Sequence, residues 1–140
     1  ALYKKGKLQV ILEDDVAKKA KYSLSIAAIL YRRGNIGGCR QYCNQTLKYQ
    51  PSNGNAWLLI ATCIARSASG DALERSKYYC LAVDKCIRAK SVDPSCAAKA
   101  NRQIASYSAH FYPKSEAFFQ GLQAGQTVTV MGESTTLRLR

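Results

Sequence analysis

The chain has 140 residues, enough for one domain with a hydrophobic core, and 47% of them are hydrophobic. Lysine and arginine number 21 against nine acidic residues, so the net charge is +12, which favours acidic partners such as nucleic acid, an anionic membrane or an acidic protein. No apolar run approaches the ~20 residues that cross a bilayer, and no signal peptide is found, so we predict no membrane span.

The N-terminal residues predict the remains of an upstream helical unit. Residues 1–13 contain Gly6 and read as one helix end, a turn and part of another helix, and the apolar run 10–12 needs a covering neighbour. The chain starts with alanine and its only methionine is Met131, so we expect a piece of a longer protein. The sequence does not decide whether the protein is cytoplasmic or is a bacterial periplasmic or exported protein.

Two helices are predicted next, over residues 16–33 and 36–49. The first has a stripe of small and apolar residues and ends at Gly34, a good C-terminal cap. The second has apolar residues at steps of three and four, and Pro51 stops it. The residues of the two apolar stripes are Ala20, Ser23, Ile26, Ala27, Leu30, Ile36, Cys39, Cys43 and Leu47.

Three further helices are predicted over residues 54–67, 72–91 and 94–109. Residues 52–55 supply N-capping side chains for the first of them. Pro94 suits the first turn of the last one. The small, polar segment 67–74 reads as a loop between the first two.

The spacing of these helices indicates an internal repeat. Pro51 and Pro94 are 43 residues apart, as are Cys43 and Cys86. This pattern resembles the tetratricopeptide repeat (TPR), a helix-turn-helix unit of about 34 residues with an early large residue, small residues where the helices cross and a late proline. An insertion within 67–74 accounts for the excess length. The positions that carry the resemblance are Gly34, Cys39, Cys43, Pro51, Trp57, Ala61, Ala82, Cys86 and Pro94.

The resemblance implies a mainly α fold, a solenoid of about five to six helices in antiparallel pairs, over residues 1–113, with residues 1–14 left from an upstream repeat. Residues 114–140 are expected to form a C-terminal extension. A short helical turn is predicted over 115–122, and strands over 125–130 and 135–140 form a β-hairpin.

The hairpin needs a packing partner, because an isolated hairpin is marginal in water. We expect its apolar residues to pack on the last helix or on Phe118 and Phe119, closing the solenoid; addition to a partner's sheet edge is the alternative. This end also resembles the C-terminus of some uncharacterised bacterial TPR-containing proteins. The apolar hairpin residues are Val128, Val130, Leu137 and Leu139.

Six cysteines and one histidine raise the question of a metal or disulfide site. No CxxC pair exists, and five of the six cysteines fall where a TPR takes a small apolar residue, so we predict core packing, with disulfides or metal as the alternatives. Thiols without a disulfide framework favour a reducing environment. His110 stands alone, and the 13–15 acidic cluster fits a helix start, so we predict no enzyme, catalytic residue or cofactor.

The resemblance implies a concave face lined by the first helix of each unit. Its basic side chains suit an acidic peptide or a carboxylate terminus, which predicts a non-catalytic interaction or scaffold module. A nucleic-acid-binding repeat protein is the alternative, although the charge is diffuse; self-association through exposed repeat ends is also open. The polar candidates for this face, which could also be ordinary exposed residues, are Lys19, Tyr22, Arg33, Asn55, Arg66, Lys99 and Arg102.

Overall fold

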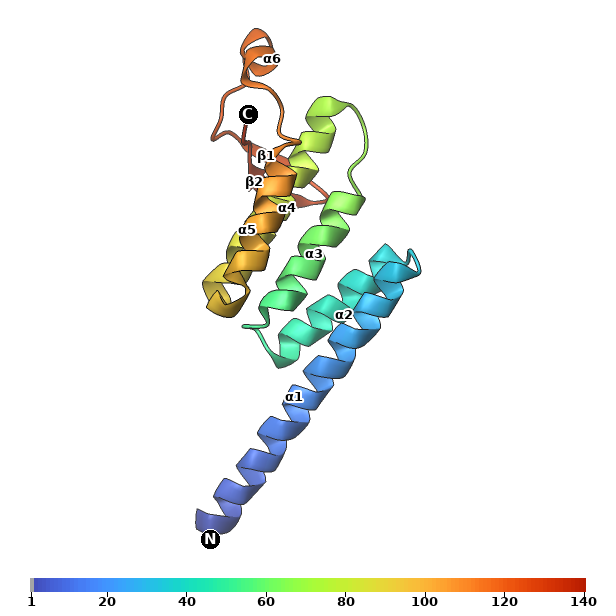
Figure 1. Ribbon diagram of the computed structural model, residues 1–140, viewed down its shortest axis with the longest axis vertical. Coiled ribbons are helices and arrows are strands. Elements are labelled where there is room, and N and C mark those ends of the chain that lie inside the picture. Colours follow the sequence, from blue (N-terminus) through green and yellow to red (C-terminus); the bar gives the residue numbers. More distant parts are fainter. Residues whose placement is uncertain (1) are drawn as a thin grey trace.

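The computed structural model describes the backbone of residues 2–140 and the side chains of residues 14–140. This part of the chain is mainly helical and ends in an antiparallel two-stranded hairpin, which confirms the expected secondary-structure class (Figure 1). The elements are α1 (Leu2–Arg32), α2 (Ile36–Tyr49), α3 (Gly54–Arg66), α4 (Ala72–Val92), a 3₁₀ turn (Pro94–Cys96), α5 (Ala97–Ser108), α6 (Lys114–Phe119), β1 (Thr127–Val130) and β2 (Glu133–Thr136).

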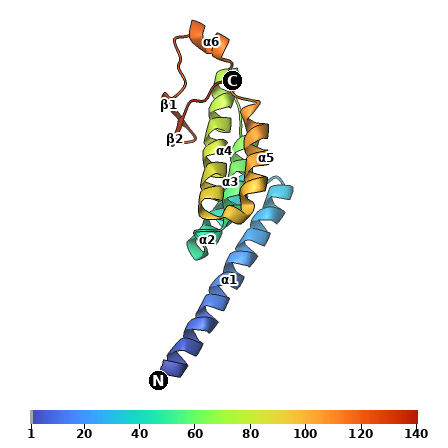
Figure 2. The ribbon, with the colours of Figure 1, turned by 60° about the vertical axis from the view of Figure 1, so that its left-hand side comes forward.

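The first five α-helices each pack on their neighbours in the sequence. The main contacts join α1 to α2, α2 to α3, α3 to α4, and α4 to α5. The ribbon views show α3, α4 and α5 running alongside one another, with the N-terminal part of α1 extending beyond the other helices (Figures 1 and 2). The C-terminal hairpin and α6 lie at the opposite end from the N-terminus (Figure 1).

The helix α1 begins earlier than the sequence suggested. A turn at Gly6 was expected, but the helix runs without a break from Leu2 to Arg32. One glycine inside a helix costs only about 1 kcal/mol relative to alanine, and favourable neighbours outweigh that cost. We also predicted that a neighbour covers the apolar side chains of residues 10–12, but these side chains lie outside the described ones.

The turn between α1 and α2 follows from Gly34. Its φ of +81° is a conformation that side chains with a Cβ rarely adopt. The Gly34 amide donates to the carbonyl of Tyr31, and the Asn35 amide donates to that of Leu30 at 2.9 Å, which is the Schellman arrangement. The Asn35 side chain then caps α2 by accepting from the Gly38 amide. The predicted C-terminal cap at Gly34 and the predicted bounds 36–49 are therefore confirmed.

The start of α3 is tied to the turn between α4 and α5. Asn53 caps α3 by accepting from the Ala56 amide at 3.0 Å, as the sequence suggested. The Gly54 amide donates to Asp93 Oδ2 at 3.2 Å. A Cβ on Gly54 would lie 2.6 Å from the Cys96 sulfur, so only glycine allows this close approach. Pro94 opens the 3₁₀ turn that leads into α5.

Small side chains dominate the core between these helices. Cysteines and alanines with no exposed surface lie on every helix from α1 to α5, and they allow close helix approach. A second buried cluster, of Cys80, Val83 and Phe111, lies on the other side of α4. The fully buried small residues of the main core are Ala27, Cys39, Cys43, Ala61, Cys63, Ala82, Cys86, Ala89 and Ala100.

All six cysteines are buried free thiols, which confirms their predicted role in packing. Cys39 and Cys63 bring α2 and α3 together, with their sulfur atoms 3.3 Å apart. Trp57 is half-buried against the main core, and Lys85 and Arg88 lie over its ring at 5.7 and 5.9 Å from the centroid.

The hairpin has a shorter turn than predicted. Thr127 pairs with Thr136, and Val130 pairs with Glu133, so the turn contains only Met131 and Gly132. Both turn residues have positive φ, at 53° and 74°, as a type I′ turn requires. The expected four-residue turn and the second strand at 135–140 are therefore wrong. The chain after Thr136 leaves the hairpin and forms a parallel bridge between Leu139 and Tyr112.

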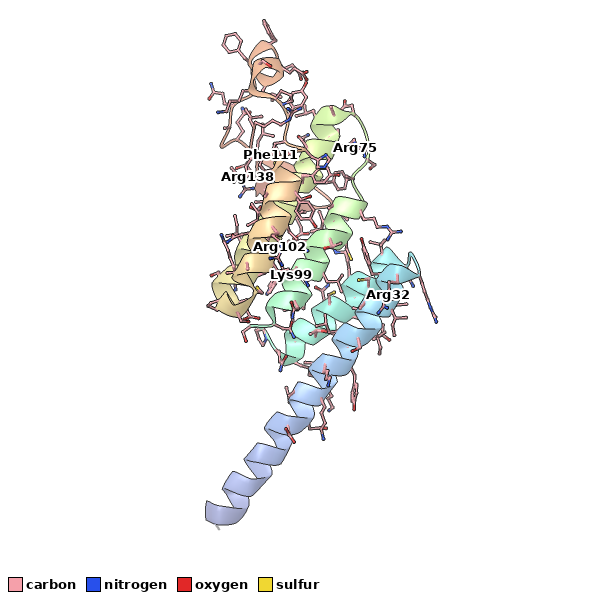
Figure 3. The ribbon with its side chains drawn as sticks, viewed as in Figure 1. Arg32, Arg75, Lys99, Arg102, Phe111 and Arg138 are labelled. Carbon is pink, nitrogen blue, oxygen red and sulfur yellow. The ribbon has the colours of Figure 1, made fainter. Side chains whose placement is uncertain are left out.

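The hairpin packs on α4, rather than on the last helix or the phenylalanine pair. Val130 and Leu137 are buried, whereas Phe118 and Phe119 are 79% and 86% exposed. Polar contacts fix this position (Figure 3 labels Arg138): Arg138 pairs with Asp84 of α4 at 2.7 Å, and the Thr135 hydroxyl donates to the same carboxylate.

Glu133 in the hairpin binds two helices at once. Its carboxylate accepts from Lys85 of α4 at 2.8 Å and lies 3.4 Å from Arg40 of α2. Burial opposes its ionisation, but the Lys85 hydrogen bond and the charges of Lys85 and Arg40 together hold its pKa below the usual value. The hairpin therefore links α2 to α4, two helices that are separated in the sequence by α3.

Candidate functional site

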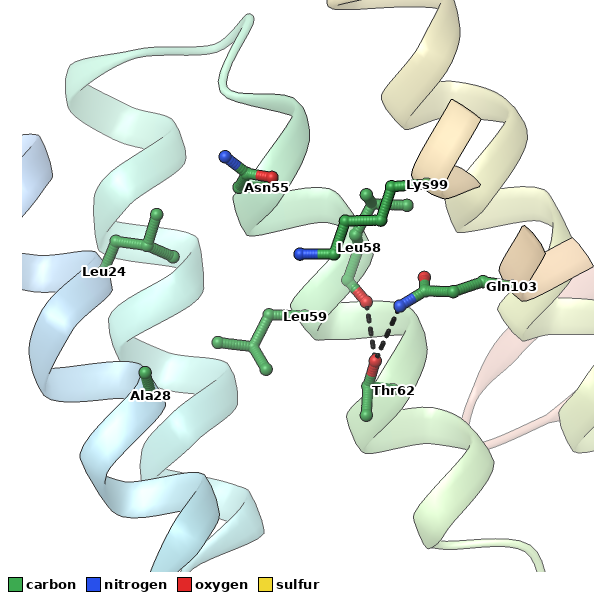
Figure 4. Close-up of a pocket in the computed structure, with 8 residues that line it drawn as sticks. All are labelled: Leu24, Ala28, Asn55, Leu58, Leu59, Thr62, Lys99 and Gln103. Carbon is green, nitrogen blue, oxygen red and sulfur yellow. Dashed lines mark hydrogen bonds between the residues drawn. The ribbon is translucent and has the colours of Figure 1, made fainter. Parts of the chain in front are cut away.

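A groove of about 300 Å³ lies between α1, α3 and α5, and we refer to it as the α1–α3–α5 groove. Each of the three helices contributes side chains to it (Figure 4). The apolar part consists of Leu24 and Ala28 from α1 with Leu58 and Leu59 from α3. The polar part consists of Asn55, Thr62, Lys99 and Gln103, the last two from α5.

The polar side chains of the groove form a short network. The Thr62 hydroxyl donates to the carbonyl of Leu58 at 3.0 Å and accepts from the Gln103 amide at 3.5 Å (Figure 4). The Tyr107 hydroxyl approaches the same oxygen at 3.4 Å, and burial raises the pKa of Tyr107. These contacts hold Gln103 and Thr62 in place on facing helices.

Lys99 supplies the positive charge at this groove. Its side chain extends from α5 toward α3 (Figure 4). Within residues 14–140, Lys99 makes no ion pair, and no carboxylate side chain lines the groove. The groove thus combines an apolar surface with a cation and several hydrogen-bonding groups, which is the composition of many ligand sites.

Two of the seven predicted binding residues line the groove, namely Asn55 and Lys99. Arg102 is three positions from Lys99 on α5 and lies near it, outside the groove lining (Figure 3). The other four predicted residues are not brought together there. They are Lys19, which pairs with Asp15, the exposed Tyr22, Arg33 just beyond α1, and Arg66, whose guanidinium lies 5.0 Å from the Tyr31 ring centre.

Sequence reasoning missed the apolar half of the groove. Leu58 and Leu59 stood in the predicted helix over residues 54–67, but nothing in that pattern separated groove residues from core residues. Gln103 could have been predicted to line the groove, because it lies one helical turn after the candidate Lys99 and therefore on the same face of the helix.

In residues 14–140, no group of histidine, cysteine and acidic side chains could hold a metal ion. Among residues 2–140, none of the helices is both long and apolar enough to traverse a bilayer. No protein-family model matches the chain, and a search of the curated proteins finds no match. The geometry of the groove is therefore the basis of the functional proposal.

Proposed function

We propose that the protein is a non-catalytic interaction module that binds a peptide segment of a partner protein in the α1–α3–α5 groove. The observation that carries this proposal is the groove itself, which is open, apolar over Leu24 and Leu59, and bordered by the cation of Lys99. A peptide-binding groove needs both an apolar surface and polar or charged groups, since apolar contact contributes affinity and polar contacts fix orientation.

We also propose that the helices form a TPR-like array. In such an array the first helix of each pair lines the concave face, and α1, α3 and α5 occupy those positions in the chain. The successive contacts from α1 to α5 and the glycine turn at Gly34 support this arrangement. Fold alone does not determine function, so the ligand is inferred from the groove.

We expect the partner segment to carry an acidic residue next to an apolar one. A side chain of leucine size fits the apolar part formed by Leu24, Ala28 and Leu59, and a carboxylate from the same segment can accept a charge-assisted hydrogen bond from Lys99. The net charge of +12 further favours an acidic partner.

A peptide-display selection tests this function. A random library is selected on the wild-type chain and on Lys99→Glu, with Arg88→Glu on α4 as a matched charge reversal away from the groove. We expect wild type and Arg88→Glu to enrich the same peptides, with an acidic residue next to an apolar one, and Lys99→Glu to lose them. If no peptides are enriched, or if Lys99→Glu keeps the same set, the groove is not the binding site.

Nucleic acid is the second candidate ligand, and the excess of 21 basic over nine acidic residues favours it. Phosphate binding releases counterions, so affinity for RNA or DNA would fall steeply as salt rises. Fluorescence anisotropy with random-sequence RNA and DNA, measured across a salt series, separates the two functions. No binding even at low salt eliminates the nucleic-acid function.

A further inference from the structure

A second pocket, of about 230 Å³, lies where the start of α4 meets the segment after α5, and we refer to it as the Arg75–Arg140 pocket. Arg75 and Tyr79 of α4 line it together with His110, Phe111 and Arg140. Figure 3 places Arg75 and Phe111 at the same end of the molecule, away from Lys99 and Arg102. This pocket shares no lining residue with the α1–α3–α5 groove.

Two arginine side chains that line this pocket have hydrogen-bond donors that the described part of the chain leaves unused. The Nε of Arg140 donates to the carbonyl of Phe111 at 2.7 Å, which fixes the guanidinium at the pocket wall. Within residues 14–140, the Nη groups of Arg140 and the whole side chain of Arg75 have no hydrogen bond or ion pair. The His110 ring stacks on Tyr79 at 4.3 Å between ring centres, at an angle of 13°.

The nearby carboxylates do not neutralise these arginines. No acidic side chain lines the pocket. Asp71, at the start of α4, accepts from the Glu74 amide as a helix cap, and Glu74 pairs with Lys77 at 2.7 Å. Arg75 and Arg140 therefore line the same small pocket, and no acidic side chain among the lining residues offsets their positive charges, which attract an anion.

We propose that the Arg75–Arg140 pocket binds a phosphate group, either as free phosphate or as a small phosphate monoester. Planar guanidinium groups bind phosphate oxygens through paired hydrogen bonds, and two of them match a tetrahedral oxyanion better than single ammonium groups do. The stacked rings of Tyr79 and His110 provide a flat surface for the organic part of a monoester. The site does not depend on the function of the groove.

Isothermal titration calorimetry tests the inference, with inorganic phosphate and phenyl phosphate as probes in a low-salt buffer free of other phosphate. We expect binding to the wild-type chain, and about tenfold weaker binding to Arg75→Gln, as expected for loss of a charge-assisted hydrogen bond. Arg140→Lys keeps the charge but loses the planar fork, so it also weakens binding. Arg102→Gln on α5 removes the same charge outside the pocket and leaves binding unchanged.

The two probes distinguish the sources of the phosphate group. Tighter binding of phenyl phosphate supports a monoester that uses the aromatic wall, and equal binding supports the free anion. Binding of neither probe overturns the inference, as does equal weakening by Arg75→Gln and Arg102→Gln, which would indicate only general attraction to a basic protein. Circular dichroism of each variant checks that the fold is kept.

Discussion

Cysteine at the helix crossings explains how closely these helices pack. Cys39, Cys43 and Cys63 are fully buried where α2 meets α3, and a thiol is a small apolar group that needs no strong hydrogen bond. Burial and the nearby Cys39 raise the pKa of Cys63 to about 12. Burial raises the pKa of Cys86 to about 12 as well, with a contribution from Cys96.

These pKa values predict slow thiol chemistry. With its pKa raised to about 12, Cys63 holds far less thiolate at pH 8 than an ordinary thiol, and thiolate is the reactive form. We expect labelling of Cys63 by a disulfide reagent, followed by mass spectrometry, to be at least about a hundredfold slower in the folded protein than in urea. Labelling of Cys63 at the urea rate in folded protein would contradict the burial described above.

Gly54 is the residue at which a single methyl group should do most damage. A Cβ there would lie 2.6 Å from the Cys96 sulfur and 2.8 Å from the Asp93 Cβ. Gly54→Ala therefore forces the α4–α5 turn away from α3, at a cost of about 1–3 kcal/mol of unfolding free energy. Urea denaturation measures this change.

Gly37→Ala is the matched control for Gly54→Ala. Gly37 is also helical, but an added Cβ there meets nothing within 4 Å. Alanine favours the helix at such a position, so the variant should be neutral or more stable by up to about 1 kcal/mol. Equal destabilisation by the two substitutions would mean that the close approach at Gly54 does not limit the fold.

At the level of the element, Glu133 is one of two carboxylates, with Asp84, that hold the hairpin against the helices. Glu133 contacts Lys85 and Arg40, and its pKa is lowered in the folded state. Since the folded pKa lies below the unfolded one, the ionised carboxylate stabilises the fold at neutral pH, and this contribution is lost as the pH falls through the folded pKa.

Glu133→Gln tests this dependence. We expect it to lower the unfolding free energy by about 0.5–1.5 kcal/mol at pH 7, a value reduced for partial exposure, and to differ less from wild type at pH 3. Urea denaturation at both pH values gives the comparison. Glu116→Gln on the exposed α6 is the control and should change little. A deficit in Glu133→Gln that is the same at both pH values would contradict the role of the charge.

Some elements could be predicted from local chemistry and some could not. The bounds of α2 follow from Gly34 and Pro51, since each fixes a backbone geometry that ends a helix. The start of α1 could not be predicted in this way, because the cost of Gly6 inside a helix is small and its helix-forming neighbours outweigh it. The hairpin register depends on Met131 adopting a positive φ, which residue preference disfavours, so local propensity pointed to a longer turn.

At the level of the whole molecule, helix positions could be predicted but their meeting points could not. Seven polar residues on the first helix of each predicted pair were candidates for ligand binding, yet only Asn55 and Lys99 of them line the groove. The remaining lining comes from the rotation of α1, α3 and α5 about their axes, which is set by packing of side chains from all the helices. The Glu133 contacts to α2 and α4 are hidden for the same reason, because they join residues far apart in the sequence.

The affinity of a selected peptide for a chain with its groove filled tests the central claim most directly. Ala28→Trp places a large ring against Leu24 and Leu59 without changing the charge, and fluorescence anisotropy measures binding while circular dichroism checks the fold. Binding through the α1–α3–α5 groove predicts a loss of about tenfold or more for Ala28→Trp and wild-type affinity for Arg88→Glu. Wild-type affinity in a folded Ala28→Trp variant would contradict peptide binding in this groove.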